Sequence, residues 1–300
     1  MRRSLVLFGL TAASAWQAWS QPKIDAVVNA ASFQSGLPAG GSLATAFCSN
    51  ITDTKIKPGV YVASSPLPYE LGGFGISVNG FLAPILAVVV TSSGRSMNAQ
   101  INFQVPSERN ISVIGLGSLF PGSMGIGPVA ELTPLPALPR WGGFFSDANG
   151  YAIAQHASDY SVVTPENPAR PGETIIGYAN DFFPVWPPPP VGSPVPPQPL
   201  FQILSSHLSF IRGPGYLYLQ KYPTLDYKGQ SWTSTPALET PFLGLAPRMI
   251  GVEQINFVVP ANQQPGDWAL FFNAGSCPDG RGSQCSLHAS SSPYVKLPVR

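Results

Sequence analysis

The stretch AQINFQVP at residues 99–106 returns as EQINFVVP at residues 253–260, 154 positions further along the chain. In both copies Ile, Phe and Val alternate with Gln and Asn, so a pleated strand turns the apolar side chains to one side and the amides to the other. The final proline has no N–H to donate to a neighbouring strand and therefore ends each copy. The shared Gln-Ile-Asn-Phe core predicts an internal duplication.

A second pair of predicted strands supports the duplication. Residues 42–48 match residues 174–179, with Phe47 at the position of Tyr178, at an offset of 131. This offset is about 23 residues shorter than the offset of the first pair, so the second repeat contains an insertion. Much of it is a proline-rich segment at about residues 182–200, whose composition favours stiff polyproline II over a core strand.

The repeated amide side chains have a predicted structural role. Gln100, Asn102, Gln254 and Asn256 lie on the polar side of their strands, and we expect them to hydrogen-bond neighbouring loops. The repeated strand is then a structural landmark rather than a duplicated binding site.

The composition favours β-structure throughout. Thirty glycines and 34 prolines among 300 residues argue against long helices and for short strands joined by turns. Asn79-Gly80 between two alternating runs predicts a hairpin, and turn signals recur at the spacing typical of a β-sandwich. We therefore predict an all-β chain of two tandem Ig-like β-sandwich domains related by internal duplication. They comprise residues 21–139 and residues 140–300, and the second contains the proline-rich insert.

The first 20 residues have the features of an export signal. Arg2 and Arg3 precede an apolar run at residues 5–15, and Ala18 and Ser20 provide the small residues of a cleavage site. The apolar run is shorter than the roughly 20 residues that a membrane span needs. These features predict cleavage after Ser20 and a secreted or cell-surface protein, with no transmembrane segment after cleavage.

The three cysteines fall into two groups. Cys277 and Cys285 flank a short polar loop, and in an exported protein we predict that they form a disulfide. Closing a loop of this length stabilises a fold by about 2–3 kcal/mol. Cys48 lies in an apolar strand and is expected to be a buried free thiol rather than a nucleophile.

The sequence has no recognisable catalytic, metal or cofactor site. It contains neither a Gly-x-Ser-x-Gly nucleophile elbow nor a P-loop. His156, His207 and His288 have no spacing that pairs them as metal ligands. Asp147 and Asn149 favour a turn over a calcium loop, because no downstream Glu completes such a loop. We therefore predict a protein that is not an enzyme and has no cofactor; a hydrolase with an unrecognised site is the weakest alternative.

Six motifs occur in a fixed order along the chain. They are VVNAASF at 27–33, GG and VNG within 72–80, QINFQVP at 100–106, NPARPGE at 167–173, GLAP at 244–247 and QINF at 254–257. Together they resemble the uncharacterised acidobacterial C-terminal domain family, found at the ends of secreted and often much larger proteins. The resemblance implies a pair of Ig-like sandwiches in an exported protein, and that family has no catalytic residues to carry over. The chain departs from the family at Cys48, where Gly is usual, in the proline-rich insert and in the Cys277 loop.

Two functions are compatible with these features. The first is a structural or adhesive module with a protein or polysaccharide partner outside the cell; a net charge of +1 without a basic run argues against nucleic acid. The second is a carbohydrate-binding module in which aromatic rings stack on sugars. Its candidate residues are Trp186, Tyr216, Tyr218 and Trp232. The competing expectation is that Tyr216 and Tyr218 face the core and that Trp186 holds the proline segment.

Overall fold

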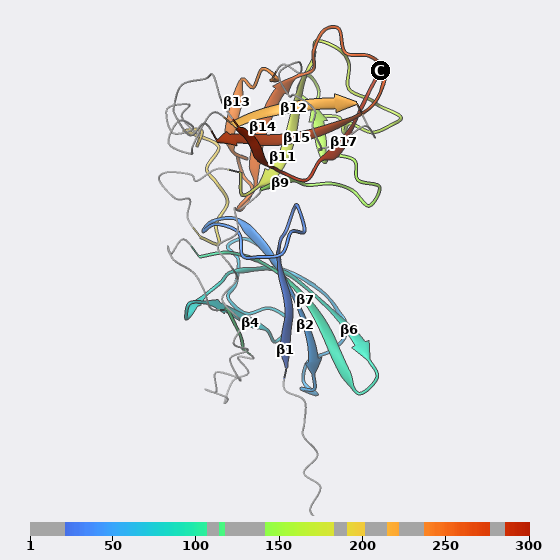
Figure 1. Cartoon of the computed structure of the whole chain (residues 1–300). Helices are drawn as coiled ribbons and strands as arrows, with labels where there is room; N and C mark the ends of the chain where they lie inside the picture. Colours follow the sequence, from blue (N-terminus) through green and yellow to red (C-terminus); the bar gives the residue numbers. More distant parts are fainter. Residues whose placement is uncertain are drawn as a thin grey trace, which may run out of the picture.

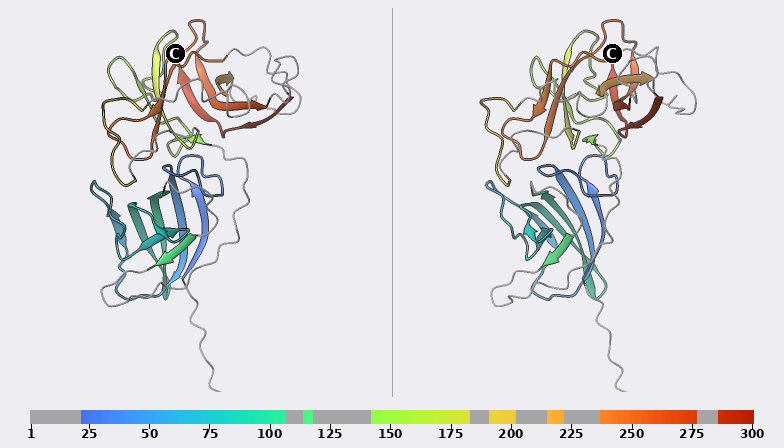
Figure 2. Two further views of the ribbon diagram at one scale, coloured as in Figure 1. Left: turned by 90° about the vertical axis from the view of Figure 1, so that its left-hand side faces the viewer. Right: turned by 60° about the vertical axis from the view of Figure 1, so that its left-hand side comes forward.

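The computed structural model describes residues 22–106, 114–117, 142–182, 191–201, 215–221, 237–276 and 286–300. Within these ranges every regular element is a β-strand, so the all-β prediction is confirmed. The strands form two lobes, each with its own buried hydrophobic cluster (Figures 1 and 2). We call residues 22–117 the N-terminal lobe and residues 142–300 the C-terminal lobe.

The N-terminal lobe contains two antiparallel sheets. Its strands are β1 Lys23–Asn29, β2 Leu43–Ile51, β3 Gly59–Val62, β4 Gly75–Val78, β5 Phe81–Leu82, β6 Ile85–Ser93, β7 Ser96–Gln104 and β8 Ile114–Gly117. The larger sheet has the order β1-β2-β7-β6-β3 and the smaller one β5-β4-β8.

The C-terminal lobe is also built from two antiparallel sheets. Its strands are β9 Gly143–Phe144, β10 Ala154–His156, β11 Thr174–Asn180, β12 Gly215–Lys221, β13 Phe242–Leu245, β14 Glu253–Val258, β15 Gly266–Ser276, β16 Ser286–Ser291 and β17 Val295–Val299. One sheet has the order β10-β11-β14-β13, with β9 also paired to β11. The other has the order β12-β15-β16, with β17 also paired to β15.

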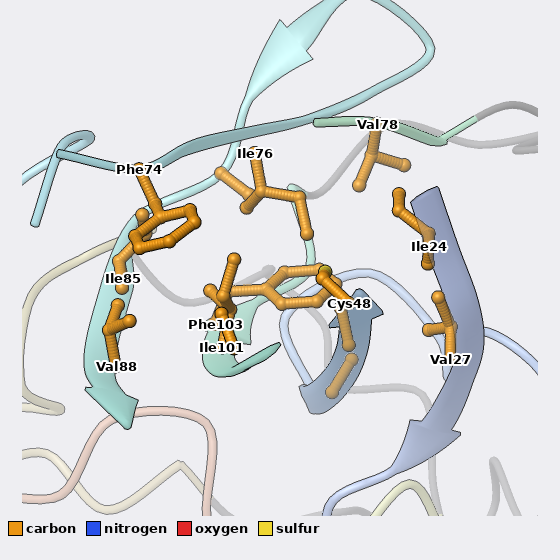
Figure 3. Packing of buried hydrophobic residues seen from close by; sticks show 14 of the residues in the cluster. Ile24, Val27, Cys48, Phe74, Ile76, Val78, Ile85, Val88, Ile101 and Phe103 are labelled. Atoms are coloured by element: carbon orange, nitrogen blue, oxygen red, sulfur yellow. The ribbon is translucent and has the colours of Figure 1, made fainter. Parts of the chain in front are cut away.

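Alternating apolar residues of the first landmark strand, β7, fill the core of the N-terminal lobe. Ile101 and Phe103 are completely buried there. Ile76 and Val78 of β4 belong to the same cluster and lie across from them, so the two sheets pack face to face (Figure 3). Burial of each such side chain is worth about 1.5–3 kcal/mol.

The Asn79-Gly80 turn follows directly from the sequence. Both residues have positive φ, 50° and 81°, and they join β4 to β5 so that Val78 lies opposite Phe81. A two-residue turn of this twist needs positive φ at both central positions, which asparagine and glycine tolerate best. The predicted hairpin is confirmed.

The second landmark strand, β14, occupies a similar place in the C-terminal lobe. Ile255 and Phe257 are buried in a cluster that also contains Leu217 and Leu219 of β12 and Leu270 of β15. The two sheets of this lobe therefore also enclose one core.

The central strand pairs of the two lobes have the same register. Thr45 lies opposite Asn102, and Ile176 lies opposite Asn256. Adding 131 to a β2 position and 154 to a β7 position gives the partners in β11 and β14 for six successive pairs. The offsets found in the sequence therefore also describe the strand pairing.

The turn after β1 matches the turn after β10, although the two sequences differ. The Phe33 N–H donates to the Asn29 carbonyl at 3.0 Å, and the Tyr160 N–H donates to the His156 carbonyl at 2.9 Å. Phe33 and Tyr160 both have positive φ, 54° and 60°. The sequence did not indicate this third match, which has an offset of 127.

Three predicted features lie outside the described residues. They are the export signal with its cleavage after Ser20, the domain boundary near residue 139, and residues 183–190 of the proline-rich insert. In the ranges given above, no helix has the length and hydropathy to cross a membrane.

Candidate functional site

Most of the predicted site residues are not described by the structure. Trp186, Trp232, Cys277 and Cys285 lie outside the described residues, so the predicted disulfide stays a prediction. Tyr216 is part of β12, but its side chain is likewise not described.

Tyr218 is the one predicted stacking residue whose side chain is described. It is half-buried, and its ring stacks on Phe271 with centroids 5.8 Å apart and an angle of 24° between the rings. Leu217 and Leu219, on the other side of β12, are the residues that enter the core cluster. Strand alternation turns Tyr218 to the opposite side of β12, where it packs on the completely buried Phe271.

Cys48 is a buried free thiol, as predicted, with 3% of its surface exposed. Burial, with a smaller contribution from the nearby Asp25 carboxylate, raises the pKa of the Cys48 thiol to about 12. Because the thiolate is the reactive form, this cysteine is inert at neutral pH.

His156 is the one histidine whose side chain the structure describes. Its Nδ1 lies 3.0 Å from both Glu173 carboxylate oxygens, and its Nε2 lies 3.2 Å from the Asn167 carbonyl oxygen. Only 2% of the His156 surface is exposed. The imidazole therefore fastens the 167–173 loop to β10 and has no nitrogen left for a substrate.

Asp147 forms a turn, as the sequence favoured. Its Oδ1 accepts hydrogen bonds from the backbone N–H groups of Asn149 and Tyr151, at 2.9 and 2.8 Å. In the part of the chain that the structure describes, no group of three or more His, Cys, Asp or Glu residues is arranged to hold a metal ion.

A buried polar junction joins the two lobes, and Asn180 is its centre. This side chain is completely buried; its Oδ1 accepts from the Leu43 N–H at 2.8 Å and its Nδ2 donates to the Leu43 carbonyl at 2.8 Å. The same Nδ2 also lies 3.0 Å from Asn29 Oδ1. The amide thus binds Leu43 much as a neighbouring strand would.

Two further side chains extend the junction. The carboxylate of Asp181 accepts from the Ala39 N–H at 2.9 Å. Gln104 is completely buried and donates to the Gly41 carbonyl at 2.8 Å, while its Oε1 accepts from the Gly192 N–H at 2.7 Å. Since Gly192 lies in the described end of the proline-rich insert, this segment is part of the contact between the lobes.

Glycines of the C-terminal lobe allow the close approach at this junction. A Cβ added to Gly143 would lie 2.5 Å from the Ser32 Cβ. One added to Gly251, which has a φ of 64°, would lie 2.8 Å from both the Gly41 carbonyl oxygen and the Leu43 Cδ2. Any side chain at these positions would push the lobes apart.

The amides of the landmark strands bond within their own sheet face, not to loops as expected. Gln254 Nε2 donates to Asn256 Oδ1 at 2.9 Å, and Gln100 Nε2 lies 3.4 Å from Asn102 Oδ1. Asn102 Oδ1 also accepts from the Thr45 hydroxyl at 3.0 Å. A spacing of two along a strand places these amides side by side on one face, which explains the bonds.

We define the second amide face as Gln155, Tyr178, Gln254 and Asn256, which lie on the side of their sheet away from the core. The Tyr178 hydroxyl donates to Gln155 Oε1 at 2.6 Å, and Gln155 Nε2 donates to the Tyr160 carbonyl at 2.8 Å. Tyr160 is 66% exposed. The face thus combines one phenol with three amide groups, and the Tyr160 phenol lies at its rim.

The first amide face consists of the matching residues Val28, Phe47, Gln100 and Asn102. Valines continue this face onto the edge strand β3, where two of them, at positions 60 and 62, are 70% and 73% exposed. Valine and phenylalanine replace Gln155 and Tyr178 here, so this face offers fewer hydrogen-bonding groups.

An open cleft of about 420 Å³ lies at one end of the C-terminal lobe. Four prolines line it, together with Glu166, Asp267 and Arg300. The Tyr151 hydroxyl donates to Asp267 Oδ2 at 3.0 Å, and Lys296 Nζ lies 4.1 Å from the centre of the Tyr151 ring. The Asp267 carboxylate at this cleft is therefore engaged by the Tyr151 hydroxyl.

Comparisons with models of protein families, with curated proteins and with solved structures found no match to this chain.

Proposed function

We propose that the chain is an exported, non-enzymatic structural or adhesive module built from two Ig-like β-sandwiches. The observation that carries this proposal is the buried junction between the lobes, centred on Asn180 and Gln104. Domains that move independently share few buried contacts, whereas these two side chains are completely buried and bind main-chain groups across the junction. A unit of this kind holds its outer surfaces at a fixed distance and angle, which suits a spacer or an adhesive protein.

The internal duplication is part of this proposal. It is supported by the shared register of the β2–β7 and β11–β14 pairs and by the common turn geometry at Phe33 and Tyr160. Two sheets enclosing one core in each lobe are in keeping with Ig-like sandwiches.

Membership of the acidobacterial C-terminal domain family, and export, also belong to the proposal. In support, several of the shared motifs have defined structural tasks here. Asn29 of VVNAASF binds Asn180 in the junction, Asn79-Gly80 forms the tight hairpin, and Glu173 of NPARPGE holds His156. In this proposal, residues 1–20 direct export to an oxidising compartment, where a disulfide between Cys277 and Cys285 can form and persist.

A non-enzymatic role is supported by the environment of the described histidine. His156 is buried and bonded through both ring nitrogens, and the carboxylate of Glu173 also accepts from the Arg170 N–H. A general base must reach the proton that it abstracts, and this pair faces its own loop.

Adhesion of coated beads tests the proposal. Beads carrying residues 21–300 are passed over surfaces coated separately with the protein and the polysaccharide fractions of the producing cell's envelope. We expect retention on at least one surface, and none for beads carrying heat-unfolded chain. Absence of retention on both surfaces contradicts the adhesive function, and turnover in a panel of esterase, glycosidase and peptidase substrates contradicts the non-enzymatic one.

A further inference from the structure

We propose that the second amide face, with Tyr160 at its rim, binds a neutral polysaccharide. This inference rests on the interaction function proposed above and names the chemical class of the partner. It places the sugar on residues other than the aromatics that the sequence suggested.

The aromatic part of the site is Tyr160 with Tyr178. Tyr160 is held at the rim by the hydrogen bond from Gln155 to its carbonyl, and 66% of its surface is exposed. Tyr178 is half-buried within the face and is fixed by its 2.6 Å bond to Gln155. The apolar faces of tyrosine rings stack on the C–H faces of sugars, and their hydroxyls remain available for polar contacts.

The amide part of the site has unused hydrogen-bonding groups. Gln254 Nε2 is used by Asn256 Oδ1. Within the described chain, Gln254 Oε1 and Asn256 Nδ2 have no hydrogen-bond partner. One is an acceptor and the other a donor, and sugar hydroxyls can satisfy both. Because the amides are already fixed by their mutual bond, binding costs less side-chain entropy.

The surroundings of the face favour a neutral ligand. Neighbouring side chains on the same side of the sheet are apolar. They include Ile153 and Val162, which are 42% and 54% exposed, and Ile176, which is buried. Asp159, which precedes Tyr160 in the sequence, accepts hydrogen bonds from both the N–H and the hydroxyl of Ser161. Among the described residues, the side chains paired across this face are uncharged, so none of them would pair with a charged sugar.

The protonation of Tyr178 suits this role. Burial, and to a smaller extent the neighbouring Tyr160 phenol, raise the pKa of Tyr178 above its ordinary value. The hydroxyl therefore keeps its proton over the whole physiological range and continues to donate to Gln155. The amide group of Gln155 is thereby held in one orientation.

The N-terminal lobe provides a matched control within the same chain. Phe33 has a positive φ, as Tyr160 has, and is 61% exposed, but Val28 and Phe47 occupy the positions that match Gln155 and Tyr178. Both lobes therefore have an exposed aromatic ring at this position. Only the ring of the C-terminal lobe is combined with the hydrogen-bonded pair Gln155 and Tyr178.

Affinity electrophoresis tests the site. Residues 21–300 are run in native gels containing hydroxyethylcellulose, xyloglucan, galactomannan or mixed-linkage β-glucan, with alginate as the charged comparison. We expect retardation in at least one neutral gel and none in alginate. Tyr160→Asn, which keeps a residue tolerant of positive φ, is expected to weaken the binding about tenfold or more, a loss of one stacked ring. Phe33→Asn is the matched control and is expected to leave it unchanged.

Each alternative result overturns the inference. Absence of retardation in all neutral gels, retardation only in alginate, or equal weakening by Phe33→Asn and Tyr160→Asn would each do so. Sedimentation of the free chain adds a further outcome: a dimer that Tyr160→Asn dissociates assigns the face to a second copy instead. If beads still adhere to the protein fraction while no gel retards the chain, this inference fails and the adhesive function stands. If the beads do not adhere and no gel retards the chain, both the inference and the adhesive function fail.

Discussion

The two amide faces occupy the same place on sheets of the same register, yet they present different chemistry. Val28 and Phe47 of the first face correspond to Gln155 and Tyr178 of the second. At these two positions the second face has a fixed hydrogen-bonded pair, 2.6 Å apart, where the first face has apolar side chains. The strand pairing itself is unchanged, which teaches that surface chemistry in this fold varies independently of the backbone frame.

The matching residues at the ends of β1 and β10 also differ in the contacts that they make. Asn29 lies at the junction and binds Asn180 of the other lobe, whereas its counterpart His156 binds Glu173 of its own lobe. The same backbone position thus joins the lobes in one case and fastens an internal loop in the other.

The largest expected effect comes from the matched core residues Phe103 and Phe257, both completely buried. Phe103→Ala and Phe257→Ala should each lower the free energy of unfolding by about 3–5 kcal/mol, because each removes a ring from a packed core. If the junction couples the lobes, urea unfolding followed by circular dichroism shows a single transition in both variants. Two separate transitions would show that the lobes are independent.

The next largest effect on stability is expected at Asn180, and Ser49, at the matching position in β2, is its control. Asn180→Ala leaves the buried Leu43 N–H without its partner and should lower the free energy of unfolding by about 2–3 kcal/mol. Ser49→Ala, at a half-buried position without a junction contact, should change it by less than about 0.5 kcal/mol. Urea titrations of the two variants measure the difference, and equal values would remove the special role of Asn180.

Alkaline pH should distinguish Cys48 from Ala179, its counterpart. The pKa of the Cys48 thiol is about 12 in the folded chain against 9.0 for the ordinary thiol. Between these values the unfolded chain releases its proton while the folded chain retains it, so the contribution to stability present below pH 9 is lost as the pH rises. From pH 8 to 10.5, wild type should lose about 2 kcal/mol more than Cys48→Ala. Parallel pH dependence in the two proteins would contradict the burial of the thiol.

The smallest effect on stability is expected from exchanging side chains between the two amide faces. Tyr178→Phe removes the hydroxyl bonded to Gln155 and should lower the free energy of unfolding by about 1 kcal/mol. The reverse change, Phe47→Tyr, should give no gain, because Val28 stands where Gln155 would accept the bond. Thermal melts of both variants make the comparison; stabilisation by Phe47→Tyr would show that the first face already contains a suitable acceptor.

Local patterns were sufficient to predict much of the fold. The alternation of apolar and amide residues correctly located β7 and β14, and Asn79-Gly80 correctly predicted the hairpin. These features depend on neighbouring residues in the chain, so the sequence carries their whole signal.

The candidate site was not predictable in the same way. Tyr160 and Gln155 lie in AQHASDY at residues 154–160, which shares a single identical residue with VVNAASF at 27–33. Their equivalence becomes visible only through hydrogen bonds of the turn. The junction is harder still, since the Asn180 contacts join residues 137 and 151 positions apart and no local periodicity encodes them.

The close contact at Gly143 and Gly251 also bears on how such chains are inherited. Ser32 and Leu43 leave no room for a side chain opposite these glycines. A C-terminal lobe taken from another protein would fit this N-terminal lobe only if it brought both glycines and an asparagine at position 180. Recombination between the two lobes would break this steric match, so we expect the two lobes to be inherited together as one unit.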